Sequence, residues 1–359
     1  MPLEVTATLD RSVAIYLTGE VIIIRVSVKN VDGRGKQSLA WGSVQLCCER
    51  TIGAQPALPD RPTTAIAKSA STVYTSVPTI LFCDVQVNTG EQRHFKAEIP
   101  LPAHGLPPTF RGHLAKYINK VTVALQHVRA PIKLIHIPIR LIPTIGIETP
   151  LQIEPNPFWA DSINQPTVSE TVASTVDGIT ASRKPHVFCM TSADGMVTSL
   201  TLFKKAFRIG EDIVGYLNFD SAPIPCIQYF ACLETVEELV DTDSNDEAEK
   251  NNSRKHFTPI NHQYGVCAFN EDTIFRLPIP HHAPPTFHTD LVHLKWRLKF
   301  EFVTTKELML VEEAGLSRPP MDLPIETLTW HVDIYVYPCT PENGALTDVS
   351  YSGSASMLI

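Results

Sequence analysis

The sequence predicts an all-β protein built from two tandem β-sandwich domains that are joined by a linker. Hydrophobic and polar residues alternate along many short segments, and one such segment occurs twice together with the motif that precedes it. The chain of 359 residues is also longer than a single hydrophobic core usually supports. Two copies of roughly 150 residues fit a pair of sandwiches.

The clearest strand is the segment Val292–Phe302. Its even-numbered residues are hydrophobic, and its odd-numbered residues are His, Lys, Arg or Glu. Successive side chains of a strand point to opposite faces, so this alternation predicts a strand with one face in the core and the other in solvent. The motif Pro-Pro-Thr-Phe at 284–287 comes just before it.

The same motif occurs 177 residues earlier, at 107–110, and a second alternating segment follows it. At this offset the hydrophobic positions of the two segments coincide, and the pattern breaks where Asn119 stands against Trp296. We interpret the prolines as fixing the chain where it joins a core strand, and the phenylalanines as closing the sandwich. The flanking alternation disfavours the other interpretation, a proline-rich ligand for another protein.

A Gly-Glu pair precedes an alternating strand in each half, at Gly19-Glu20 and at Gly210-Glu211. We interpret both as structural turns, because a duplicated acidic active site at a turn would be unusual. The residues that we expect to define the two copies structurally are Gly19, Glu20, Pro107, Pro108, Phe110, Gly210, Glu211, Pro284, Pro285, Phe287 and Trp296.

The alternation places the strands of the first domain, residues 1–145. They are expected at 3–9, 13–17, 21–29, 39–48, 80–87, 93–99, 117–126 and 132–141. The stretch 50–76 is rich in Pro, Ala and polar residues, and we expect a long mobile loop there. Residues 146–185 lose all periodicity and are expected to be the linker, with a local anchor at Phe158-Trp159.

The second domain is expected over residues 186–338. Its strands are placed at 187–190, 200–207, 213–219, 226–234, 292–302 and 328–336. Eight acidic residues fall between Glu234 and Glu249, and we expect a solvated loop there because no glycine-centred calcium pattern accompanies them. The polar, Ser- and Gly-containing tail over 339–359 is expected to be disordered.

Composition excludes several classes of protein. A net charge of −8 argues against a protein that grips nucleic-acid phosphates. Residues 1–10 lack the charged start and apolar core of a secretory signal, and no apolar run is long enough to span a bilayer. The eight cysteines form no Cys-x-x-Cys pair, which favours reduced thiols in the cytosol.

No group of residues predicts catalysis, a cofactor or a metal ion. The densest ligand-like cluster is His281, His282, His288 and His293, but His293 belongs to the wet face of a strand and the others to a proline-bounded loop, so zinc is disfavoured. No nucleophile elbow or phosphate-binding loop is present. We therefore expect that the protein is not an enzyme and that it acts by presenting a binding surface to other proteins.

Several short segments, in the right order, carry a resemblance to a known family. They are Ile80–Asp84, Phe110–Gly112, Lys116-Tyr117, Arg208–Asp212, Leu294–Leu298 and Phe300–Thr304. With the repeated proline motif they resemble the arrestin fold and, more narrowly, the retrograde Golgi transport family Rgp, over about residues 2–145 and 186–338. The fold implied is two tandem arrestin-like β-sandwiches.

The resemblance also implies a function. Members of that family pair with a large, β-propeller-containing Ric-type protein to form a guanine-nucleotide exchange factor for a Golgi Rab GTPase of the Rab-six type, in retrograde transport. This implies a cytoplasmic subunit without a cofactor, bound only peripherally at Golgi membranes. The alternative is an arrestin-like cargo or receptor adaptor, against which the sequence shows no Pro-Pro-x-Tyr motif and no paired lysines in 3–9.

Overall fold

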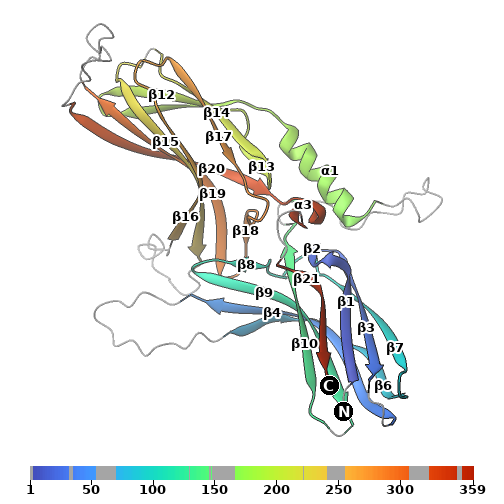
Figure 1. The fold of residues 1–359 in the computed structure, drawn as a ribbon. Helices are drawn as coiled ribbons and strands as arrows, with labels where there is room; N and C mark the ends of the chain where they lie inside the picture. The colour runs from blue at the N-terminus through green and yellow to red at the C-terminus, as the bar shows by residue number, and fades with distance from the viewer. Residues whose placement is uncertain are drawn as a thin grey trace, which may run out of the picture. The chain divides into compact units, whose positions relative to one another are not determined.

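The computed structural model describes most of the chain and divides it into two compact units (Figure 1). The described residues are 3–31, 35–53, 70–128, 130–144, 147, 166–220, 222–240, 255–306, 323–345 and 350–359. Unit 1 contains Met1–Ala173 together with Cys339–Ile359, and unit 2 contains Ser174–Pro338. Strands dominate both units, which confirms the all-β prediction.

Unit 1 is built from two sheets. Its strands are β1 (Leu3–Val13), β2 (Ile15–Leu17), β3 (Val21–Asn30), β4 (Gln37–Ile52), β5 (Ser71–Thr75), β6 (Thr79–Val87), β7 (Gln92–Pro100), β8 (Phe110–Arg111), β9 (Ala115–His127), β10 (Lys133–Ile142) and β21 (Ser352–Leu358). One sheet has the order β21-β1-β3-β7. The other has the order β2-β10-β9-β4-β5, with β6 on β4 and β8 on β9.

Unit 2 has the same plan. Its strands are β11 (His186–Ser192), β12 (Gly195–Leu202), β13 (Ala206–Arg208), β14 (Asp212–Asn218), β15 (Cys226–Leu239), β16 (Lys255–Val266), β17 (Asp272–Pro278), β18 (Phe287–His288), β19 (Val292–Thr305) and β20 (Ile325–Tyr337). The sheet orders are β11-β12-β14-β17 and β13-β20-β19-β15-β16, with β18 on β19. The short strand β2 runs parallel to β10 in unit 1, and the short strand β13 runs parallel to β20 in unit 2.

The two sheets of each unit face each other across an apolar core. In unit 2 the ring of Phe275 on β17 meets that of Phe300 on β19 edge-on, with 5.3 Å between centroids. Phe300, Phe302 and Trp296 on the predicted dry face of β19 are all at most 1% exposed. The alternation read from the sequence therefore gives the correct inward face of this strand.

The C-terminal tail belongs to the first unit, so the expectation of disorder over 339–359 is wrong for β21. This strand pairs antiparallel with β1, from Glu4 opposite Leu358 to Val13 opposite Ser352. A short helix, α3 (Pro341–Ala345), precedes it. Strand β21 takes the edge position that β11 takes in unit 2, so unit 1 is completed by the last residues of the chain.

The predicted linker contains a helix, α1 (Val168–Ala181), which the analysis of periodicity missed. Thr167 and Glu170 form a capping box at its start. The Thr167 N–H donates to Glu170 Oε2 at 2.8 Å, and the Glu170 N–H donates to Thr167 Oγ1 at 3.2 Å. Val172 and Val176 are buried on one face, one turn apart. The expected anchor at Phe158-Trp159 lies outside the described residues.

Strands extend into two segments that were expected to be loops. Of the expected loop 50–76, residues 54–69 lie outside the described residues, but 71–75 form β5. Strand β15 continues to Leu239, and Glu234 and Glu237 are buried in it, so the acidic stretch is not a solvated loop from its start. Residues 241–254 of that stretch lie outside the described residues.

Replacement of Gly353 in β21 tests whether the tail is part of unit 1. An added Cβ would lie 1.9 Å from the backbone oxygen of Arg11, so β21 would have to move away from β1. We expect Gly353→Ala to lower the free energy of unfolding by about 1 to 3 kcal/mol in denaturant titrations. Gly344→Ala in α3 is the matched control, since the nearest neighbours of its Cβ would be at 3.6 Å, and it should not lower the free energy of unfolding. Equal stability of both variants would argue against the pairing of β21 with β1.

Candidate interaction surface

The two Gly-Glu turns have the same geometry. Gly19 has φ of 91° and Gly210 has φ of 86°, a left-handed conformation that favours glycine. Glu20 Oε2 accepts a hydrogen bond from the Leu17 N–H at 2.8 Å, and Glu211 Oε2 accepts one from the Arg208 N–H at 3.1 Å. In both units the carboxylate therefore holds the backbone of its own turn.

Each carboxylate also has a cationic partner. Arg11 binds Glu20 through both terminal nitrogens, at 2.9 and 2.8 Å. Lys204 pairs with Glu211 and also donates to the Thr180 carbonyl at 2.9 Å. Because both charges are neutralised by these pairs, the geometry suits a structural role for Glu20 and Glu211 and not acid-base chemistry.

The two Pro-Pro-Thr-Phe segments, here called the proline corners (107–110 and 284–287), bind the neighbouring strand in the same way. In unit 1 the Thr109 N–H donates to the Leu141 carbonyl at 3.0 Å, and the Leu141 N–H donates back to Thr109 Oγ1 at 2.9 Å. In unit 2 the same pair joins Thr286 to Val336, at 2.8 and 3.0 Å. Each threonine therefore clamps its corner to β10 or β20.

The one mismatch of the repeat makes the same hydrogen bond in both units. Asn119 Nδ2 donates to the Pro107 carbonyl at 3.0 Å, and Trp296 Nε1 donates to the Pro284 carbonyl at 3.1 Å. An amide and an indole N–H thus replace each other as donors to a proline carbonyl. The proline corner of unit 1 is therefore hydrogen-bonded to both β9 and β10, and that of unit 2 to both β19 and β20. Phe110 and Phe287 are buried behind it.

The histidines of the second corner do not converge on a common point. The rings of His288 and His293 meet edge-on with centroids 6.0 Å apart. His281 lies against the Gly210 turn, where a Cβ would come within 2.2 Å of its ring. Within the described ranges no group of three or more His, Cys, Asp or Glu side chains could hold a metal ion.

A groove of about 600 Å³ lies on the outer face of the larger sheet of unit 1. Its lining comes from β4, β6, β9 and β10 with the turn before β6. The lining residues are Trp41, Ser43, Gln45, Cys47, Glu49, Pro78, Ile80, Cys83, Lys120, Thr122, Ala124, Leu134 and His136. Ile80 is 68% exposed and Leu134 is 49% exposed, so apolar side chains of this groove face solvent. Such a lining suits apolar side chains or an aliphatic ligand.

The polar groups of the groove are paired with one another. Lys120 Nζ lies 2.6 Å from Glu49 Oε1, and the Thr122 hydroxyl lies 3.1 Å from His136 Nδ1. Burial lowers the pKa of His136, and the nearby Lys120 lowers it further. The imidazole is therefore neutral at neutral pH, and the groove carries little net charge.

The described chain also exposes apolar side chains on an edge strand of unit 2. Phe257, Tyr264 and Val266 on β16 are 43%, 69% and 69% exposed. The guanidinium of Arg297 lies 4.2 Å from the centre of the Phe257 ring and pairs with Glu234. The sequence analysis missed β16 because Phe257, Tyr264 and Val266 lie on its more exposed face. Its less exposed face carries polar residues such as Thr258 and Gln263, so hydrophobicity does not mark an inward face.

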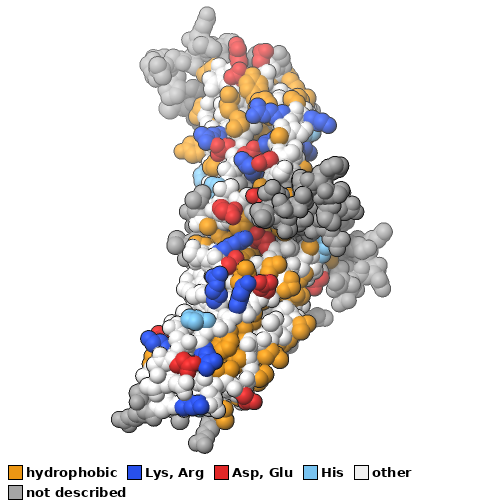
Figure 2. Space-filling view, turned by 90° about the vertical axis from the view of Figure 1, so that its right-hand side faces the viewer, with side chains coloured by type: hydrophobic (Ala, Val, Ile, Leu, Met, Phe, Trp, Pro, Cys, Tyr) orange, Lys and Arg blue, Asp and Glu red, His pale blue; other side chains and the backbone are white. Residues whose placement is uncertain are grey.

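One face of the molecule mixes charged and apolar side chains (Figure 2). On the face that Figure 2 shows, hydrophobic side chains gather on the unit that contains both termini, with acidic and basic side chains around them. No helix in the described part of the chain is long and apolar enough to cross a membrane. Apolar side chains that form a contiguous exposed patch are typical of interaction sites.

Comparisons with known proteins give consistent results. The model of the Rgp1 family matches residues 156–305. Two curated relatives, each named RAB6A-GEF complex partner protein 2, are 30% identical to the chain. The human protein aligns over 94% of this chain and 95% of its own length, and the bovine protein over 92% and 93%.

The proline corner of unit 2 can be tested by removing its hydroxyl. In Thr286→Val the Val336 N–H loses its acceptor while the side-chain shape is kept, so we expect the free energy of unfolding to fall by about 1 to 3 kcal/mol. Thr329→Val, at an exposed position on β20, is the matched control and should change it by less than about 0.5 kcal/mol. Both would be measured by denaturant titration, and equal effects of the two replacements would count against the clamp.

Proposed function

This chain belongs to the Rgp1 family, and we propose on that basis that it is a non-catalytic scaffold subunit of a heteromeric guanine-nucleotide exchange factor for a Rab-six type GTPase. The proposed larger subunit is a Ric-type protein that contains β-propellers. The proposed site of action is the cytoplasmic side of Golgi membranes, in retrograde endosome-to-Golgi and intra-Golgi transport.

One observation carries the proposal. A human protein named as a RAB6A-GEF complex partner aligns with 94% of this chain and with 95% of its own length. The match therefore includes both sandwich units, and not one shared domain. It supports a role for the whole chain in an exchange complex.

The structure is compatible with that role in physical terms. Nucleotide exchange makes and breaks no covalent bond, because a factor acts by stabilising the nucleotide-free GTPase and so shifts a binding equilibrium. Such a subunit needs rigid surface. Two sheet pairs that are locked at their proline corners, with exposed apolar side chains such as Ile80 and Tyr264, supply it.

The test is a nucleotide-release assay with purified proteins. Fluorescent GDP release from a Rab-six type GTPase would be followed with this chain, with its Ric-type partner, and with both together. We expect at least about a tenfold acceleration by the pair, corresponding to about 1.4 kcal/mol of barrier, and none by this chain alone. A Rab of another subfamily serves as the control and should not respond.

The opposite pattern would favour the arrestin-like adaptor. If the chain alone bound receptor or cargo tails, formed no complex with the Ric-type protein and left every Rab unaffected, the proposed scaffold role would be wrong.

A further inference from the structure

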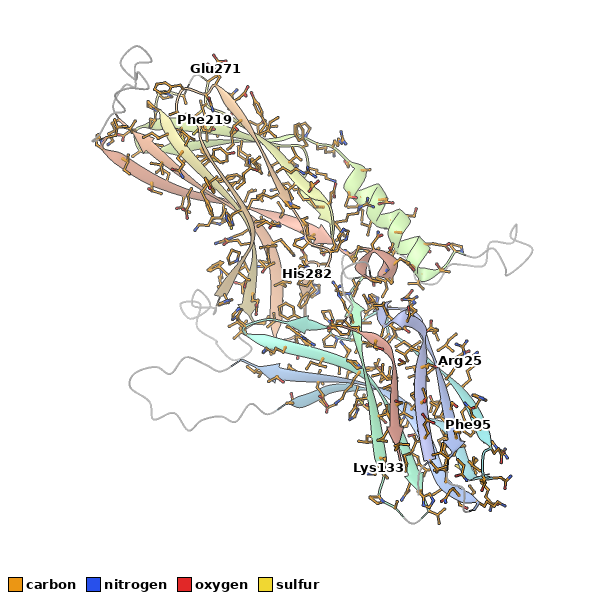
Figure 3. All side chains as sticks on the ribbon, in the orientation of Figure 1. Arg25, Phe95, Lys133, Phe219, Glu271 and His282 are labelled. Atoms are coloured by element: carbon orange, nitrogen blue, oxygen red, sulfur yellow. The ribbon has the colours of Figure 1, made fainter. Side chains whose placement is uncertain are left out.

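Two buried thiols meet at one end of unit 2. Cys226 begins β15 and Cys267 follows β16, and their Sγ atoms are 3.4 Å apart. Cys226 is 6% exposed and Cys267 is 1% exposed. Figure 3 marks this end of the unit by Phe219 and Glu271, whose backbones are joined by a hydrogen bond of 2.8 Å.

We propose that Cys226 and Cys267 form an intramolecular disulfide when the protein meets a peroxide. A disulfide needs its sulfurs about 2.05 Å apart, so the two Sγ atoms must approach by only a little more than 1 Å from their present separation. Side-chain rotation supplies movements of this size without a change of strand pairing.

The backbone on both sides holds the thiols in register. The Cys267 N–H donates to the Ile227 carbonyl at 2.8 Å, and the Ala268 N–H donates to the same oxygen at 3.1 Å. The Asn270 N–H closes the turn on the Cys267 carbonyl at 3.0 Å. These bonds fix the segment that carries Cys267 against the residue next to Cys226.

The fold itself does not require a thiol at this place. Cys226 pairs with Thr304 of β19. At the offset of 177 residues, Thr304 corresponds to His127 of β9, and His127 pairs with Leu39. Leu39 is therefore the counterpart of Cys226 in unit 1. Leu39 is fully buried, so an apolar side chain satisfies the packing there. The thiol pair is therefore a feature that unit 2 adds to the shared plan.

The proposed reaction has two steps. The more exposed Cys226 attacks the peroxide as a thiolate, the O–O bond breaks, and a sulfenic acid and water form. The Cys267 sulfur then attacks the Cys226 sulfur, the S–S bond forms and a second water leaves. The net change is one hydrogen peroxide and two thiols to one disulfide and two waters. Because the hydrogen bond with Cys267 and burial raise the pKa of Cys226, the first step is slow.

The disulfide would fasten the edge of the larger sheet. The two cysteines are 41 positions apart in sequence, and the β15–β16 hairpin lies between them. Closing a loop of this length restricts the unfolded chain, so the oxidised protein should unfold at a temperature roughly 5 to 15 °C higher than the reduced one. The crosslink would hold β16 and its exposed aromatic side chains in place.

The experiment treats the full chain with hydrogen peroxide, alkylates the remaining thiols and maps the peptides by mass spectrometry. We expect a peptide pair that joins Cys226 to Cys267, together with the higher unfolding temperature, and we expect a reducing agent to reverse both. Cys226→Ala should abolish the crosslink and the shift. Cys232→Ala removes a buried thiol from the same strand and is the matched control that should leave both unchanged.

Two outcomes would overturn the proposal. One is that Cys226 and Cys267 are both recovered as alkylated thiols after the exposed Cys83 and Cys189 have been oxidised. The other is that Cys226 is found mainly in a disulfide with a different cysteine. A folding defect in Cys226→Ala would not obscure the result, because the peptide map of the unmodified sequence decides it directly.

Discussion

The hydrogen-bond clamp at each proline corner is the constraint on which the two units depend. Thr109 and Thr286 each exchange two hydrogen bonds with the neighbouring strand, while Asn119 or Trp296 holds the adjacent proline carbonyl from the central strand. Proline supplies no N–H, so the corner relies on these contacts to satisfy its backbone. In each unit the long strand that follows the corner, β9 or β19, buries its apolar face in the core.

Unit 1 differs from unit 2 in where its last edge strand comes from. In unit 2 the edge strand β11 immediately precedes β12 along the chain, whereas in unit 1 the edge beside β1 is filled by β21 from the C-terminus. The contact between Leu3 and Ile359 therefore spans nearly the whole sequence. Pairing between residues so far apart in sequence gives unit 1 a high contact order. The four-stranded sheet of unit 1 therefore joins two segments from opposite ends of the sequence.

Alternation predicted the strands that have one buried face, such as β19, and the motif repeat predicted that two similar units exist. Alternation did not predict strands whose inward-facing residues are small or polar. The inward positions of β21 are Gly353, Ala355 and Met357, whose pattern is weak, and β16 is partly exposed on both faces. The capping box at Thr167 lies in a stretch rich in Ser and Thr, where hydrophobic periodicity gives no signal for α1. The groove of unit 1 depends on strand register across the sheet, which the sequence does not specify locally.

A protein built in this way offers shaped and partly apolar surface on two internally cross-braced sandwiches, as the proposed scaffold role would require. The claim that the corners provide the stiffness is tested most directly by NMR-detected hydrogen exchange at the amides of Leu141 and Val336. Both amides should exchange only by global unfolding of their unit, since each N–H is donated to a threonine oxygen. Exchange of either amide at the rate of an exposed loop would contradict it.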